Sequence, residues 1–224
     1  MRGNELLGWL CALPAAARDR ALEEHLGIAQ PRRKSQAAPP GPDLIGYQAS
    51  GVAAIVRALV DVPVGATDVL VDLGAGLGKV VLLAHLLTGA RVRGIEIQPE
   101  LVTCARAAAR RLGLGREVEL SQGDARQADL EPASVFYLYA PFTGVTLQAV
   151  LARLERVANE RAIVICALGV DLHRNAPWLV ARESDAFWLT VYDSVVNGVP
   201  ARVAQPSTLE RSLSDIVMRE TESS

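Results

Sequence analysis

One turn constrains the fold of this chain more than any other feature: the run DLGAGLG at Asp72–Gly78. It follows the short apolar stretch 68–73, which predicts a buried strand, and precedes the apolar stretch 79–87, which predicts a buried helix. Glycines let the backbone turn tightly and let a ligand approach without a Cβ in the way. The helix start behind them presents unpaired N–H groups and a positive dipole end. Strand, glycine turn and helix in this order predict a ligand site in an α/β fold.

The chain from Tyr47 onward alternates helix and strand patterns around this turn. Helical patterns occupy 51–60, 79–87, 99–112 and 146–157. Strand patterns occupy 68–73, 91–97, 118–122, 134–139, 162–167 and 187–195, with a weaker one at 180–183. This alternation predicts an α/β fold: a doubly wound, mostly parallel sheet of about seven strands with helices on both faces.

Three zones are expected along the chain. Residues 1–28 predict a small N-terminal helical segment, because leucines recur there at helical spacing. Residues 29–46 form a proline-rich linker with a short basic cluster, and residues 47–224 form the main domain. A capping box at 207–210, followed by apolar residues at helical spacing, predicts a C-terminal helix on that domain.

Composition narrows the classes of partner. The formal net charge of −2 gives no electrostatic case for nucleic acid, which usually binds a concentrated basic surface, so no nucleic-acid partner is expected. The three cysteines are far apart in the sequence, so neither a disulfide framework nor a metal site is indicated, and a cytoplasmic location fits best. The apolar stretch 6–17 follows only Arg2 and Glu5, which makes a cleaved signal a poor fit. No apolar run has the roughly 18 residues of a membrane helix.

Acidic residues near the glycine turn discriminate between two cofactor classes. A dinucleotide site has the pattern G-x-G-x-x-G, but Lys79 stands where its last glycine belongs, and that glycine falls at Gly78 instead. Glu96, at the end of the next strand pattern, can accept hydrogen bonds from ribose hydroxyls, as in either class. Asp124, after the third strand pattern, can accept an adenine amino group. Together with Asp72 these acids would repel a pyrophosphate, so they favour a cationic ligand that carries adenosine.

This constellation resembles class I S-adenosylmethionine-dependent methyltransferases. Asp72–Gly78 looks like their motif I, Glu96 like the ribose acid and Asp124 like the adenine acid, and the resemblance spans roughly 47–192. It is similar above all to small bacterial members of unassigned substrate, and distantly to lysine methyltransferases that lack a SET domain. The resemblance implies S-adenosylmethionine as cofactor and S-adenosylhomocysteine as product.

The resemblance also implies roles for individual residues. Asp72 would act on the ammonium group of the cofactor directly or through water, and Tyr47 would close over the cofactor unless it is an ordinary domain-edge aromatic. Ribose would be taken by Glu96, beside Ile97, and adenine by Asp124 and the Ala125 backbone. The methionine half would be lined by the glycine turn: Gly74, Ala75, Gly76 and Gly78.

The acceptor is expected at the end of the fourth strand pattern, where Tyr139 is followed by Ala140, Pro141 and Phe142. Tyr139 is the leading candidate for lining the acceptor pocket, with Pro141 and Phe142 shaping its wall; core packing is the other interpretation. Amino-methylating relatives often carry Asn or Asp where Ala140 stands. This departure weakens the assignment of adenine or glutamine N-methylation to this chain. The acceptor is left as an amine or hydroxyl of a small molecule or protein.

Two other functions remain open on the sequence. An NAD-dependent oxidoreductase would use the same turn, although Lys79 disfavours it. A non-catalytic cofactor-binding module would keep the fold without turnover. Among the histidines, His173 is a candidate base or a solvated loop residue, while His25 and His85 lie in helical patterns and indicate structural roles.

Overall fold

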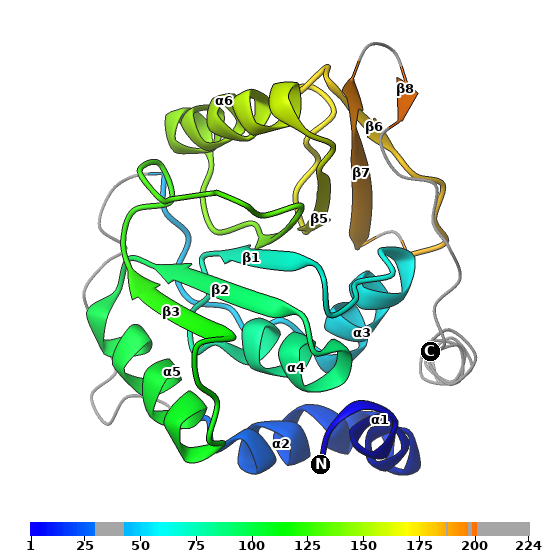
Figure 1. Cartoon of the computed structure of the whole chain (residues 1–224), viewed down its shortest axis with the longest axis vertical. Helices are drawn as coiled ribbons and strands as arrows, with labels where there is room; N and C mark the ends of the chain where they lie inside the picture. Colours follow the sequence, from blue (N-terminus) through cyan, green and yellow to red (C-terminus); the bar gives the residue numbers. More distant parts are fainter. Residues whose placement is uncertain (30–42, 187, 197–198, 201–224) are drawn as a thin grey trace.

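The computed structural model describes residues 1–29, 43–186, 188–196 and 199–200. Its helices are α1 (Gly3–Ala12), α2 (Ala15–Leu26), α3 (Val52–Asp61), α4 (Lys79–Thr88), α5 (Pro99–Arg111) and α6 (Gly144–Glu160). Its strands are β1 (Val69–Leu73), β2 (Arg91–Glu96), β3 (Val118–Gln122), β4 (Val135–Tyr139), β5 (Val164–Leu168), β6 (Leu179–Ala181), β7 (Leu189–Val196) and β8 (Val199–Pro200). Figure 1 shows them as one α/β domain.

The strands form an eight-stranded sheet in the order β3-β2-β1-β4-β5-β7-β6, with β8 paired to β7. Strands β1 to β5 are parallel, whereas β7 runs antiparallel to both β5 and β6. The chain moves outward from β1 to β3 and then returns to β4 beside β1, so strand order reverses between β1 and β4. In open α/β sheets a crevice for ligands forms at such a reversal, outside the carboxyl ends of the strands.

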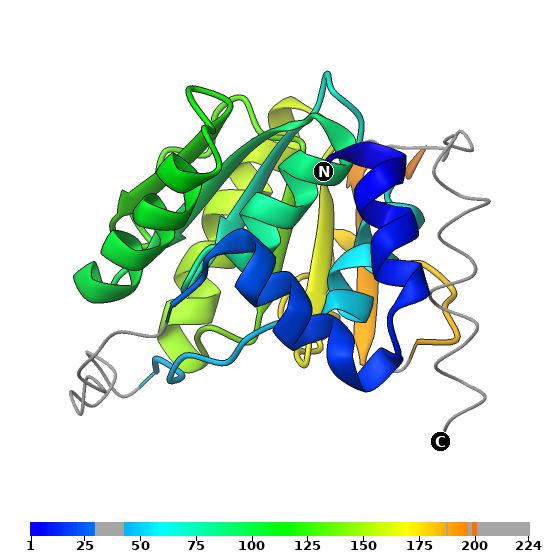
Figure 2. The same ribbon diagram turned by 90° about the horizontal axis from the view of Figure 1, so that it is seen from below.

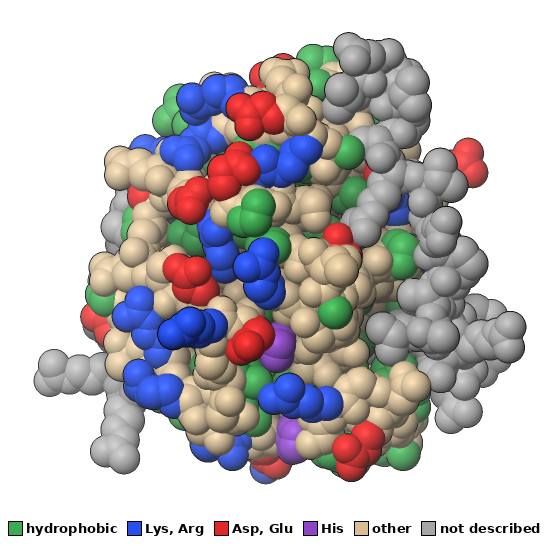
Figure 3. All heavy atoms as spheres, in the orientation of Figure 1, with side chains coloured by type: hydrophobic (Ala, Val, Ile, Leu, Met, Phe, Trp, Pro, Cys, Tyr) green, Lys and Arg blue, Asp and Glu red, His purple; other side chains and the backbone are tan. Residues whose placement is uncertain are grey.

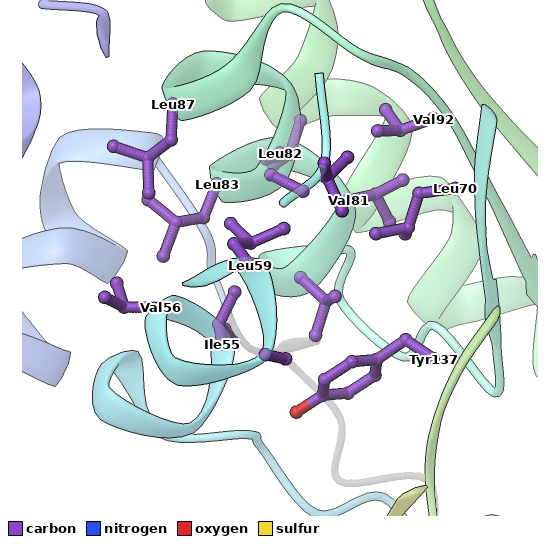
Figure 4. Packing of buried hydrophobic residues seen from close by; sticks show 14 of the residues in the cluster. Ile55, Val56, Leu59, Leu70, Val81, Leu82, Leu83, Leu87, Val92 and Tyr137 are labelled. Atoms are coloured by element: carbon purple, nitrogen blue, oxygen red, sulfur yellow. The ribbon is translucent and has the colours of Figure 1, made fainter. Parts of the chain in front are cut away.

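Side chains of the central strands point alternately to the two faces of the sheet and contribute to two hydrophobic cores, one on each face. One core contains Leu70 and Tyr137 and packs against α3, α4 and α5; the other contains Val71 and Phe136 and packs against α6. Figure 4 shows aliphatic side chains of α3 and α4 meeting those of β1 and β2, with Tyr137 beside them. Helices on both faces and a mostly parallel sheet confirm the predicted fold class.

The N-terminal helices are part of the first core. Five of their leucines are completely buried: Leu6, Leu7, Leu10, Leu22 and Leu26. In Figure 2 the two helices lie across α3 and α4, which they contact. The sequence predicted these helices correctly, and the structure adds that they pack on the domain that carries the glycine turn.

The predicted elements between 51 and 183 are all found, with their ends within three residues of the expected positions. The strand expected at 187–195 is β7, which begins at Leu189 and ends at Val196; residue 187 lies outside the described residues. The predicted C-terminal helix and most of the predicted linker also lie outside them. Among the described helices, none combines the length and the apolarity that crossing a bilayer would require.

Candidate active site

The carboxyl ends of β1, β2 and β3 lie side by side and surround one pocket. The pocket encloses about 880 Å³ of empty space, counting its open mouth. Its walls include all three acids expected at the strand ends, Asp72, Glu96 and Asp124. The register explains this convergence, because Asp72 pairs with Gly94 on β2 and Glu96 pairs with Gln122 on β3. One site therefore collects carboxylates from three separate segments of the sequence.

Each glycine of the turn has a positive φ and a close neighbour. A Cβ on Gly74 would lie 2.5 Å from Cβ of Pro141, and one on Gly76 would lie 2.3 Å from Cε2 of Tyr47. A Cβ on Gly78 would lie 3.1 Å from Cβ of Ala105 on α5. Of the turn, Gly74 and Ala75 line the pocket. Gly76 and Gly78 are not among the lining residues, which differs from the expectation: Gly76 lies against Tyr47, and Gly78 serves helix packing.

Glu96 is fixed at the edge of the pocket by two main-chain donors. The N–H of Gly76 donates to its Oε2 and the N–H of Gln98 donates to its Oε1, each at 2.9 Å. The side chain is only 7% exposed. A carboxylate held by two N–H groups keeps lone pairs for further donors, such as a pair of hydroxyl groups. Ile97, beside it, also lines the pocket.

Asp72 is the most deeply buried of the three acids. Its residue is 3% exposed, and the structure gives its carboxyl group no hydrogen bond or ion pair with another described residue. Burial, and secondarily the nearby charge of Glu96, raises its pKa to about 8. A buried acid without a partner that faces a pocket is a candidate functional group, because a cationic ligand would relieve its desolvation.

Asp124 is held by a residue that the sequence analysis missed. The Arg126 guanidinium pairs with its carboxylate, with Nη2 2.6 Å from Oδ2, and the Arg126 main-chain N–H donates to Oδ1 at 2.8 Å. These hydrogen bonds hold the pKa of Asp124 below its usual range. Asp124 and Ala125 both line the pocket. The only sequence signal for this pairing is the two-residue spacing of the acid and the arginine.

The residues after β4 form another part of the pocket wall. Tyr139, Pro141 and Phe142, the residues predicted to line an acceptor site, all line the pocket. Between them Ala140 has a φ of 35°. Residues other than glycine seldom adopt this left-handed region, and strained positions of this kind cluster at functional sites.

A segment of the predicted linker closes the site over these residues. The N–H of Ile45 donates to the Pro141 carbonyl at 3.1 Å, and the N–H of Thr143 donates to the Asp43 carbonyl at 2.7 Å. We call residues 43–50 the strap; all of its residues except Asp43 line the pocket. The sequence analysis included Tyr47 in the site but assigned the preceding residues to the linker, because they show no periodicity.

Tyr47 lies where the strap meets the glycine turn. Burial raises its pKa to about 12, with smaller contributions from the charges of Glu23, Asp72 and Glu96. The hydroxyl group therefore stays protonated at neutral pH. The Tyr47 ring lies against the Gly76 backbone and lines the pocket.

The histidines lie apart from the pocket. The His25 ring lies at a tilt to the Trp9 ring, with centroids 5.3 Å apart, and Nδ1 of buried His85 lies 2.8 Å from the Ala90 carbonyl oxygen. His173 is in an exposed turn, and its main-chain N–H donates to Asp171. None of these histidines lines the pocket. Within the described residues, no group of three His, Cys, Asp or Glu side chains could hold a metal ion.

Comparison with known proteins agrees with this geometry. Residues 70–161 match a family described as a methyltransferase domain. The release factor glutamine methyltransferase of Moorella thermoacetica is 33% identical over an alignment of 176 residues, which covers 68% of this chain but only 58% of that protein. The crystal structure of an RNA methyltransferase from Salinibacter ruber, in complex with S-adenosylhomocysteine, is 31% identical, with a TM-score of 0.54. That match covers 70% of this chain and all of the Salinibacter chain.

A third structure, MtNAS in complex with S-adenosylmethionine, is 17% identical with a TM-score of 0.50 over 61% of this chain and 58% of its own, and it supports the fold alone. The pocket suits S-adenosylmethionine, whose demethylated product is bound in the Salinibacter structure, since a buried acid and two further carboxylates face a site closed by a glycine turn. Identity, coverage and fold agree with the motif, and the chain belongs to the class I S-adenosylmethionine-dependent methyltransferases.

Proposed function

We propose that this chain transfers the methyl group of S-adenosylmethionine to an amine or hydroxyl group of a small-molecule or protein acceptor. One observation carries the proposal: a single pocket joins the three strand-end acids to the Tyr139–Phe142 segment after β4. The acids suit a cationic adenosine compound, and the segment after β4 offers a wall on which a second molecule can lie. An NAD-dependent reaction fits less well, because Lys79 stands where a dinucleotide-binding turn has its last glycine.

Residues at the ends of different strands would bind different parts of the cofactor. Asp72 would balance positive charge, Glu96 with Ile97 would bind the ribose, and Asp124 with Ala125 would bind the adenine. The turn would bring its backbone close to the methionine portion through Gly74 and Ala75, while Gly76 and Gly78 shape it and Tyr47 covers it. When bound, S-adenosylmethionine supplies an electrophilic methyl group.

The chain would contribute mainly by aligning the acceptor with the methyl group of the cofactor. Methyl transfer from a sulfonium is an in-line displacement, in which positioning contributes more than acid–base chemistry. Tyr139, Pro141 and Phe142 would fix the direction from which the acceptor approaches. Tyr47 is a poor base, because its pKa of about 12 keeps it protonated. An amine acceptor would therefore enter as the neutral form, and its proton would leave to solvent.

The acceptor class follows from what the site lacks. Ala140 has no side-chain group to orient a target nitrogen, and the Pro141 carbonyl already accepts a hydrogen bond from the strap. The Salinibacter and Moorella relatives are named for different acceptors, RNA and a glutamine, so their names agree only in being methyltransferases. Figure 3 shows basic and acidic side chains interleaved on one face, where RNA would favour a continuous basic surface. A small molecule or protein fits best, and three cysteines spaced far apart in the sequence suit a reducing cytoplasm.

The test is turnover. Incubation with S-adenosylmethionine carrying a labelled methyl group and a fractionated cell extract should yield S-adenosylhomocysteine and one labelled fraction. A Gly76→Arg variant should yield neither, because any side chain at that position displaces Tyr47. Equal yields from the two proteins would refute the proposal. Cofactor binding without any transfer from a broad set of extracts would favour a non-catalytic binding module.

A further inference from the structure

Lys79 is a buried cation in the wall of the cofactor pocket. It is the first residue of α4, directly after the glycine turn, and it is 4% exposed. It is also one of the residues that line the pocket. In a dinucleotide site this position belongs to a glycine. Here it places a positive charge beside a pocket whose proposed ligand carries two positive groups.

Two carboxylates of α2, neither of which lines the pocket, form ion pairs with this cation. Nζ of Lys79 lies 2.5 Å from Oδ1 of Asp19 and 2.8 Å from Oε1 of Glu23. Asp19 also accepts the Val52 main-chain N–H at 3.0 Å, at the start of α3. Since Glu23 contributes to the raised pKa of Tyr47, its charge is felt at the turn. Helix α2 is thus linked to the wall of the cofactor site through its ion pairs with Lys79.

The charge near the pocket should affect the two forms of the cofactor differently, because they differ in charge. S-adenosylmethionine carries a sulfonium, an ammonium and a carboxylate, whereas S-adenosylhomocysteine lacks the sulfonium and has one positive charge fewer. An uncompensated charge about 10 Å away in a partly solvated site changes the affinity for a unit charge on the order of fivefold. Such a charge therefore acts on the substrate form of the cofactor more than on the product form.

We infer that Asp19 and Glu23 are positioning residues for the cofactor site, which offset the charge of Lys79 and so keep it from weakening the binding of the sulfonium form of the cofactor relative to the product. This inference rests on the proposed function. It gives α2 a role in cofactor discrimination, in addition to its packing in the core. Nothing in the motif itself requires it, because both carboxylates lie on a helix more than fifty residues earlier in the sequence.

The experiment compares dissociation constants for the two cofactor forms by calorimetry. The variants are Asp19→Asn with Glu23→Gln, Lys79→Met alone, and the triple combination. Asn at position 19 keeps an oxygen for the main-chain bond of Val52. Glu24→Gln is the matched control on the same helix, since Glu24 pairs with exposed Arg20.

One lysine and two carboxylates give this cluster a net charge of −1; the double variant makes it +1, Lys79→Met makes it −2 and the triple variant makes it 0. The double variant should therefore lose affinity for S-adenosylmethionine relative to S-adenosylhomocysteine by more than the roughly fivefold expected for one unit of charge. Lys79→Met should shift this ratio roughly fivefold in the opposite direction. The triple variant should fall between the double variant and the wild type, and the control should leave the ratio unchanged. A purely structural contact would weaken both ligands together, so equal changes for the two ligands in the double variant and in Lys79→Met would overturn the inference. If the double variant does not fold, the sign of the change in Lys79→Met decides. A wild-type protein that binds neither ligand would refute the proposed function itself.

Discussion

Replacing Asp72 with Asn should stabilise the cofactor-free protein while removing its cofactor affinity. The pKa of Asp72 rises from 3.8 to about 8 on folding, mainly through burial. A carboxyl group with a raised pKa contributes its full stability below the unfolded pKa and loses it as pH rises through the folded pKa. Since one pKa unit corresponds to about 1.4 kcal/mol, this group costs the folded state about 4 kcal/mol at pH 7 and on the order of 5 kcal/mol above pH 8. Asn is uncharged and of similar shape, so it avoids this cost.

Urea unfolding of both proteins between pH 4 and pH 9 measures the difference. The free energy of unfolding of the variant should equal that of the wild type near pH 4, exceed it increasingly as pH rises, and level off above about pH 8. Saturating S-adenosylmethionine should stabilise the wild type and leave the variant unchanged. A variant that is no more stable than the wild type at pH 8, or that binds the cofactor equally well, would refute the role given to the buried carboxyl group.

Further substitutions probe other parts of the site. Glu96→Ala should weaken cofactor binding by about 1–3 kcal/mol in calorimetry, because ribose donors and two main-chain N–H groups lose their acceptor; unchanged affinity would place Glu96 outside the site. Gly76→Ala should weaken binding by displacing Tyr47, whereas Gly8→Ala, which meets no atom within 4 Å, should not; equal effects would disprove the close approach. Burial raises the pKa of Cys166 to about 12, so this thiol should resist iodoacetamide at pH 8 in the native protein and react after unfolding; rapid native labelling, read by mass spectrometry, would contradict its burial.

The parts of the site that the sequence predicts are local ones. A strand, a glycine turn and a helix follow one another within twenty residues, and each leaves its own pattern of apolar residues and glycines. The topology of a parallel sheet then brings the acids after the next two strands to the same edge. Asp72, Glu96 and Asp124 could therefore be assigned before the structure was known.

The parts that the sequence does not predict depend on contacts between distant segments. The strap forms by hydrogen bonds between residues 43–45 and 141–143, and irregular main-chain pairing leaves no periodic pattern. The Lys79 ion pairs join α4 to a helix that the sequence treats as a separate zone. The glycine pattern also does not reveal the close approach of Gly78 to Ala105 on α5, which the folding of a later helix onto the turn creates.

Binding calorimetry of the full chain with S-adenosylmethionine, S-adenosylhomocysteine and NAD, each titrated separately, tests the central claim most directly. The account predicts saturable binding of both sulfur compounds, abolished in Asp72→Asn for S-adenosylmethionine, and no measurable binding of NAD. Saturable binding of NAD, with none of either sulfur compound, would contradict the assignment of the pocket.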